Sequence, residues 1–208
     1  MRNYATRLHI SIHSACGVAK RFLTTFAMET YKKNWFKYVI GFGICFLIRI
    51  IPFRPPNIEP ILVTQMPFSK SYGGTAGFLF AFFSIVIFDA LAGEIGVWTW
   101  VTAGMYGFLG IWASYYFKNK NNTSLEYATF AVMGTIAFDV VTGLSIGPLF
   151  FQQPFVEAFV GQIPFTALHL LGNVSFAFFV SPLIYRFVIE NRKLETSSLL
   201  SFLNIQNA

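Results

Sequence analysis

Long runs of hydrophobic residues alternate with short polar or proline-bearing breaks along this chain. A helix rises ~1.5 Å per residue, so about 20 apolar residues cross a hydrocarbon core roughly 30 Å thick. The pattern therefore predicts an all-α protein that crosses a membrane several times. The predicted helical runs cover residues 36–53, 58–69, 73–92, 97–117, 125–143 and 163–188.

The breaks between the runs carry the residues expected to end helices. Residues 54–60 read RPPNIEP, and their three prolines remove backbone donors and bias the preceding residues away from helical angles. The run that follows is short and contains Pro67, so it is either a short crossing helix or a re-entrant segment. Residues 144–162 contain two prolines and two adjacent glutamines, and they are predicted to be irregular.

The placement of basic residues selects between these two topologies. If the short run crosses, the chain has six transmembrane helices with a short second one, and both termini lie on the same side. The opposite side then keeps only Arg49 and Arg54. Basic residues mark the cytoplasmic side of membrane proteins, so both termini are predicted to be cytoplasmic in a multi-pass protein of the cell membrane. The cytoplasmic set holds 13 of the 15 Lys and Arg residues: Arg2, Arg7, Lys20, Arg21, Lys32, Lys33, Lys37, Lys70, Lys118, Lys120, Arg186, Arg192 and Lys193.

Composition agrees with a membrane protein, since hydrophobic residues make up 55% of the chain and charged residues 12%. We expect a six-helix domain over residues 36–190 and a cytoplasmic tail over residues 191–208. Residues 1–35 form a basic arm, whose acid-poor composition also fits a transit peptide or an over-long gene start. The net charge of +6 is explained by orientation, so no nucleic-acid partner is expected.

Several common chemistries lack their sequence signatures. Cys16 and Cys45 are too few and too separated for a disulfide framework or a thiolate metal site. No GxxxxGK[ST] phosphate loop and no HExxH motif occur. We therefore expect no catalytic residues, no metal and no cofactor, and no ATP hydrolysis by a phosphate loop in this chain.

Two similar motifs place an aspartate at the end of an apolar run. Residues 88–96 read FDALAGEIG, and residues 138–147 read FDVVTGLSIG. A carboxylate at membrane depth costs about 2.5 kcal/mol or more, so such residues usually face inward toward a partner or a ligand. Gly93 and Gly143 follow each aspartate by four residues and are either helix stops or ligand contacts.

Under the six-helix topology, polar residues from several helices gather in the outer half of the membrane. His169 and Asn173 are four apart, and hence share one helix face. This clustering predicts a pocket for a polar or zwitterionic ring compound. Each residue also has an interpretation without a ligand: an aspartate pairs with Arg49, His169 is a packing residue, or the tryptophans belong to an interface belt. The predicted substrate-binding residues are Arg49, Asp89, Trp98, Trp100, Asp139, His169 and Asn173.

Three passages carry a resemblance to a transporter family: PPNIEP with MPFSKSYGG within residues 55–74, GFLFAFFSIVIFDALAG at residues 77–93, and IPFTALHLLGN at residues 163–173. Over about residues 37–192 the chain resembles the substrate-binding S component of energy-coupling factor (ECF) vitamin transporters. The resemblance implies six spans, cytoplasmic termini and tight binding of a small vitamin-like solute in the outer half. It also implies a transmembrane coupling subunit and two ATPase subunits as partners, docked through small residues at Gly41 and Cys45.

Two other functions fit the same aspartates. A proton-coupled secondary carrier would use Asp89 or Asp139 as its proton site, since intramembrane acids mark relays in transporters. An intramembrane aspartyl enzyme would let the two carboxylates share a proton and activate water. The GxGD signature expected of such peptidases is absent from both motifs.

Overall fold

The computed structural model describes residues 34–51, 59–196, 198 and 201 of the chain. Contacts between residues divide the chain into two units, residues 37–192 and residues 1–36 with 193–208. Every predicted site residue lies in the first unit. The predicted basic arm falls outside the described residues except for residues 34 and 35.

Every regular element in the described part of the chain is a helix, which confirms the all-α prediction. A first helix covers residues 34–50 and ends just before the proline-rich segment. Three later helices begin and end within one residue of the runs predicted over residues 73–92, 97–117 and 125–143. The later elements are α2 (Pro60–Tyr72), α3 (Gly74–Ala92), α4 (Val97–Phe117), α5 (Ser124–Gly143), α6 (Ile146–Phe150), α7 (Phe155–Ile184), a π-helical turn (Tyr185–Ile189) and a 3-10 turn (Arg192–Leu194).

Among the residues that the structure describes, three stretches are long and apolar enough to cross a membrane: Gly74–Ala92, Ser124–Phe150 and Phe155–Ile189. Large hydrophobic side chains stand on the outside of these helices, with Leu91 and Leu149 exposed by 77% and 74%. Soluble proteins rarely expose so much contiguous apolar surface, whereas lipid accommodates it. These helices indicate a membrane protein.

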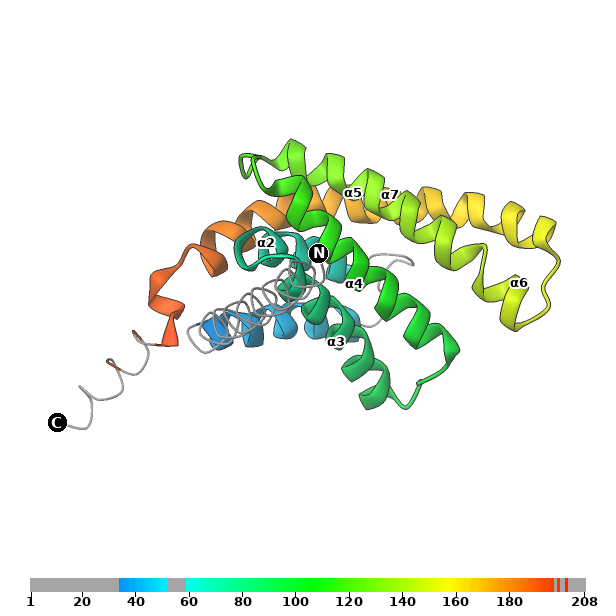
Figure 1. The fold of residues 1–208 in the computed structure, drawn as a ribbon, viewed down its shortest axis with the longest axis horizontal. Helices are drawn as coiled ribbons and strands as arrows, with labels where there is room; N and C mark the ends of the chain where they lie inside the picture. Colours follow the sequence, from blue (N-terminus) through cyan, green and yellow to red (C-terminus); the bar gives the residue numbers. More distant parts are fainter. Residues whose placement is uncertain (1–33, 52–58, 197, 199–200, 202–208) are drawn as a thin grey trace, which may run out of the picture. The chain divides into compact units, whose positions relative to one another are not determined.

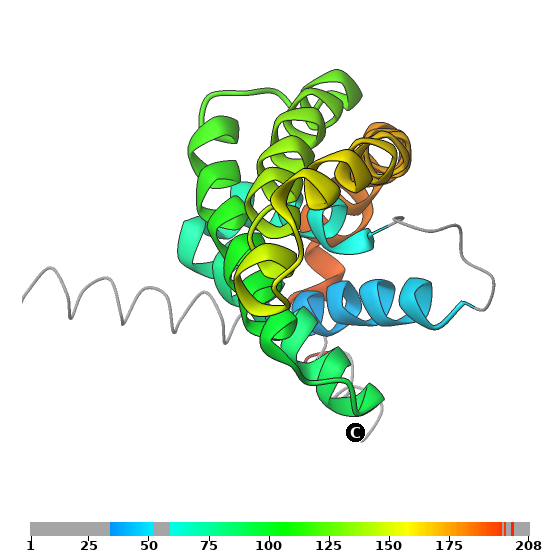
Figure 2. The same cartoon turned by 90° about the vertical axis from the view of Figure 1, so that its right-hand side faces the viewer.

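The short helix α2 is enclosed by its neighbours (Figures 1 and 2). It contacts α3, α4, α5 and α7, and every residue from Pro60 to Ser69 is buried. One of its polar side chains forms a hydrogen bond inside the bundle: Gln65 Nε2 donates to the Tyr106 carbonyl at 3.1 Å. With 13 residues, α2 is about 20 Å long. It is a buried central helix rather than a helix with a lipid-facing stripe.

Two helix pairs, α3 with α4 and α5 with α7, make the most extensive contacts around α2 (Figures 1 and 2). Between α3 and α4 the backbones touch at Gly77 and Gly110, where a Cβ on Gly110 would come within 2.5 Å of the Gly77 carbonyl carbon. Small residues allow this close approach, which is common between membrane helices. The α5–α7 interface instead carries buried polar pairs.

The prediction of an irregular segment over residues 144–162 is wrong in part. A short helix, α6, forms there, and α7 already begins at Phe155 and runs through Pro164. Pro154 occupies the position just before the helix, where its missing donor does no harm. Proline within a membrane helix is tolerated because neighbouring groups satisfy the freed backbone carbonyl. The last helix is therefore longer than the predicted run.

Candidate functional site

A cavity of about 280 Å³ lies among the helices of the 37–192 unit. The first helix, α3, α4, α5 and α7 all contribute to its wall. Four of the seven predicted binding residues line it, so the structure brings together much of the predicted site. The lining residues are Arg49, Glu59, Ile85, Asp89, Glu94, Trp98, Thr102, Tyr106, Phe138, Phe165 and His169.

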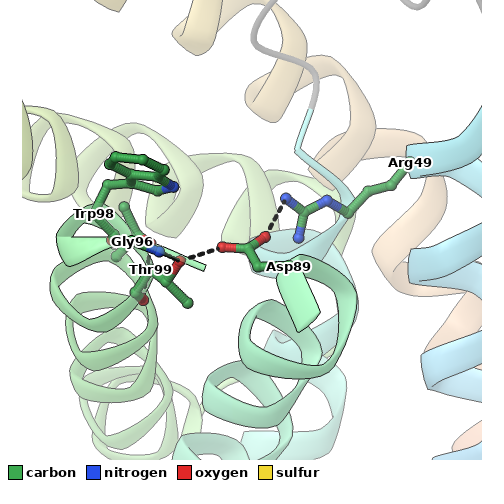
Figure 3. A network of polar contacts seen from close by, with 6 residues as sticks. Arg49, Asp89, Gly96, Trp98 and Thr99 are labelled. Atoms are coloured by element: carbon green, nitrogen blue, oxygen red, sulfur yellow. Dashed lines mark hydrogen bonds and ion pairs between the residues drawn. The ribbon is translucent and has the colours of Figure 1, made fainter. Parts of the chain in front are cut away.

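Asp89 is held from two sides at this cavity (Figure 3). Arg49 Nη2 lies 3.7 Å from its Oδ1, and the Thr99 hydroxyl donates to its Oδ2 at 2.7 Å. The Arg49 guanidinium also sits 4.0 Å from the centre of the Phe88 ring, within the range of a cation–π contact. The simpler interpretation, in which one aspartate pairs with Arg49, is thus confirmed for Asp89.

The turn between α3 and α4 places the Thr99 hydroxyl next to Asp89 (Figure 3). Gly93 ends α3 with a φ of 74°, a left-handed conformation that glycine adopts without steric penalty. Three residues later, the Gly96 amide donates to Thr99 Oγ1 at 3.1 Å at the start of α4. One hydroxyl therefore joins the start of α4 to the end of α3, and Gly93 is confirmed as a helix stop.

Asp139 has a different partner, the imidazole of His169. His169 Nδ1 and Asp139 Oδ1 lie 2.7 Å apart, and both residues are 1% exposed. The His169 ring meets the rings of Phe138 and Phe165 edge-on, with centroids 5.8 and 5.7 Å away. His169 lines the cavity and Asp139 does not, so Asp139 orients the imidazole from behind.

Asn173 lies one helical turn from His169 and repeats the pairing between α5 and α7. Its Nδ2 donates to Thr135 Oγ1 at 2.9 Å, and both residues are buried. Thr135 and Asp139 are four apart on α5, as His169 and Asn173 are on α7. Asn173 is absent from the cavity wall, so it stabilises the α5–α7 register rather than the wall itself.

The two predicted tryptophans, Trp98 and Trp100, lie in different surroundings. Trp98 lines the cavity and its ring stacks on Phe151 with centroids 6.5 Å apart. Trp100 is 53% exposed and neighbours Phe82, away from the lining residues. Residues two apart on a helix point about 200° apart, so the two side chains cannot serve one site. The exposed position of Trp100 fits an interface belt residue instead.

The expected docking pair faces inward. Cys45 is fully buried, and a Cβ on Gly41 would come within 3 Å of the Phe68 and Phe80 rings. Both residues therefore pack against the chain's own α2 and α3. The exposed side of the first helix carries larger apolar residues such as Leu47.

The set of predicted binding residues omits Thr99 and three of the aromatic wall residues, Tyr106, Phe138 and Phe165. Thr99 is visible as a polar residue in the first turn of α4, ten residues after Asp89. The three aromatics lie inside apolar runs, where nothing in the pattern separates a wall residue from a packing residue. Only the arrangement of α4, α5 and α7 around the cavity selects them.

The two aspartates have separate partners. Asp89 contacts Arg49 and Thr99, whereas Asp139 contacts His169. Within the described ranges, no three His, Cys, Asp or Glu side chains meet in an arrangement that could hold a metal ion. No family model, curated protein or solved structure matches the chain.

Proposed function

We propose that this protein is the solute-binding S component of an ECF-type transporter in the cell membrane. The cavity is the observation that carries the proposal. Its wall combines an ion pair, a buried histidine and several aromatic rings, the mixture that binding pockets use to orient small molecules. At about 280 Å³ it lies just below the usual ~300–1,000 Å³ range, so the solute is small.

The proposed membrane arrangement has six spans with both termini in the cytoplasm. The first helix, α2 and α4 then join the three apolar stretches as spans, with α2 too short to cross alone. This places the ends of α3 and α5 that carry Asp89 and Asp139 toward the outside. The distribution of lysine and arginine supports that orientation. The cavity then takes solute from the outer side.

Energy for release on the inner side would come from partner subunits, a transmembrane coupling subunit and two ATPases. The chain itself carries no phosphate loop, which agrees with such a division of labour. The docking surface of this proposal does not include Gly41 and Cys45, because both residues pack against other helices of the same chain. The lipid bilayer surrounds the exposed apolar faces of α3, α5 and α7.

The test is solute retention by the purified protein. Mass spectrometry of the protein isolated from its native host should find a bound small molecule that stays without ATP. Asp89→Asn and Asp139→Asn should both weaken its binding. Trp98→Leu should weaken binding as well, whereas Trp100→Leu is the matched control and should leave it unchanged. Full affinity in both aspartate variants, together with an unaffected Trp98→Leu, would contradict a solute site in this cavity.

A second candidate, a proton-coupled carrier, is favoured by one observation. The buried Asp139–His169 pair could take up and release a proton within the membrane, as carboxylate and histidine relays do in pumps. Uptake by this chain alone in vesicles with an imposed proton gradient would support the carrier. Uptake that requires co-purified ATPase subunits and ATP would support the S component.

A further inference from the structure

Two buried nitrogen-bearing side chains at the cavity have donors that their known partners do not use. His169 is bonded through Nδ1, and its Nε2 has no hydrogen-bond partner in the part of the chain that the structure describes. Arg49 faces Asp89 through Nη2, and its Nε and Nη1 likewise find no partner within the described ranges. Buried polar atoms are nearly always bonded, so these atoms point to a ligand.

The state of the Asp139–His169 pair decides whether Nε2 donates or accepts. A carboxylic acid that donates to Nδ1 of a neutral imidazole leaves a hydrogen on Nε2. A carboxylate beside an imidazolium also leaves a hydrogen on Nε2. Both forms are neutral overall, whereas a carboxylate beside a neutral imidazole would bury an uncompensated charge, which costs several kcal/mol.

One further neutral form would turn Nε2 into an acceptor, with the acid proton on Asp139 Oδ2. That oxygen is buried and has no hydrogen-bond partner among the residues described. A hydroxyl at this position would have no acceptor for its hydrogen, and an unsatisfied buried donor lowers the stability of the folded protein. The favoured forms therefore carry a hydrogen on Nε2, for which the described residues offer no acceptor.

Arg49 adds a second donor, because its guanidinium is always protonated and has no acceptor atoms. The side chain is only 14% exposed, and both Arg49 and His169 belong to the same cavity wall. Two buried donors from different helices match an anion with more than one acceptor oxygen. A carboxylate is such an anion, and its hydrogen bonds to charged donors are about twice as strong as neutral ones.

The remaining wall suggests the body of the solute. Trp98, Tyr106, Phe138 and Phe165 contribute aromatic surface to a cavity of about 280 Å³, which suits one small planar ring. Glu59 and Glu94 also line the cavity and offer acceptors to an amino or hydroxyl group elsewhere on the solute. Glu94 is exposed, so water and salt screen its repulsion of an anion.

From these contacts we propose that the solute is a small ring carboxylate, whose anionic group accepts hydrogen bonds from His169 Nε2 and Arg49 Nη1. The inference rests on the proposed function, because it assigns a chemical class to the same cavity. It narrows the polar or zwitterionic compound expected from sequence to one that carries an anion at this end.

Benzoate, benzamide and benzamidinium test this, since they share one ring and a similar shape but carry charges of about −1, 0 and +1. Their binding to the purified full-length protein can be compared at millimolar concentration by ligand-observed NMR. Benzoate should bind about tenfold more tightly than benzamide, because its hydrogen bonds are charge-assisted. Benzamidinium should bind most weakly.

Variants at position 169 identify the donor. His169→Gln keeps an N–H near the position of Nε2 and should retain part of the preference for benzoate. His169→Leu removes one of the two donors and should therefore weaken benzoate binding more than benzamide binding, which narrows the difference between these two probes. A purely structural role would weaken all three probes equally. If His169→Leu does not fold, the relative affinities of the three probes for the unaltered protein still test the inference.

The inference fails if benzamidinium binds as well as benzoate, or if benzoate does not bind. A retained native solute with no anionic group would overturn it too, while leaving the proposed solute-binding function intact. If no solute is retained and none of the three probes binds, both proposals fail. A retained ring carboxylate together with the benzoate preference supports both.

Discussion

The two aspartate motifs, FDALAG and FDVVTG, look like copies, but their carboxylates have different partners. Asp89 lies at the cavity in an ion pair with Arg49, and both side chains keep 10–14% exposure. Asp139 is 1% exposed and bonds His169 behind the cavity wall. In the first motif the helix ends at a left-handed glycine, Gly93, whereas in the second motif α5 ends with Gly143 as its last residue and without a left-handed cap. Similar sequence thus yields one acid that lines the cavity in an ion pair and one acid that orients a histidine.

The surroundings of a membrane carboxylate, and not its local motif, therefore set its role. Asp89 is reached by an arginine from another helix and by a hydroxyl ten residues away. Asp139 is reached by a ring nitrogen 30 residues later in the chain. Each contact depends on how helices pack around α2, which neither motif encodes. Four predictions separate the two sites further, in order of expected effect.

The largest effect should follow from removing His169. In His169→Leu, Asp139 stays buried without its partner, and breaking a buried pair on one side typically costs about 3–5 kcal/mol. The free energy of unfolding in detergent should fall by that amount. The double variant with Asp139→Leu and His169→Leu should recover most of the loss. Equal stability of the single variant and the unaltered protein would show that the pair is not an energetic unit.

Asp89→Asn should have a smaller effect on stability. It removes the charge that faces Arg49 but keeps an oxygen to accept from Thr99, and the Phe88 ring still contacts the guanidinium. We expect a loss of about 2 kcal/mol, in the range of hydrogen bonds to charged groups. The unfolding measurement used for His169 applies here. A loss larger than that of His169→Leu would reverse the proposed ranking of the two sites.

Thr99→Val tests the link between the end of α3 and the start of α4. The variant leaves Asp89 Oδ2 and the Gly96 amide without this hydroxyl, which should cost about 1.5 kcal/mol. Thr99→Ser keeps the hydroxyl and is the control. Equal stability of the valine and serine variants would mean that the hydroxyl does not stabilise the turn.

The smallest effect compares the two motif glycines. Gly93→Ala forces a side chain into the left-handed region and should cost about 1 kcal/mol. At Gly143 a Cβ would meet only the flexible end of Gln162, which can swing away at the loss of its bond to Thr166. Gly143→Ala should therefore cost less than Gly93→Ala. Thermal unfolding of the two variants side by side measures the difference.

Much of the helical layout could be predicted because apolar runs and helix breakers are local signals. The run predicted over residues 97–117 coincides with α4 (Val97–Phe117), and the aspartate motifs sit at the ends of α3 and α5. The beginning of α7 could not be predicted in this way. Pro148, Pro154 and the two glutamines beside Pro154 indicate irregular backbone, but α7 begins directly after Pro154. Packing against neighbouring helices overrides that local bias.

Residue type and placement along the chain predict some of the residues that line the cavity, whereas geometry decides the others. Arg49, Asp89, Trp98 and His169 were predicted from their polarity and placement, and all four line the cavity. Trp100 has the same residue type as Trp98 but faces away, since helical rotation separates them. The choice of His169 as the partner of Asp139 depends on the register of α5 against α7. That register involves contacts distant in sequence, which no local pattern reveals.

The enclosure of α2 has a consequence for how the protein is made. A helix of about 20 Å that carries buried Gln65 and Ser69 is too short and too polar to enter a bilayer by itself. The Gln65 amide finds its acceptor, the Tyr106 carbonyl, only when α4 is already present. We therefore expect biogenesis in two stages, in which the long helices are inserted first and α2 is drawn in as they assemble.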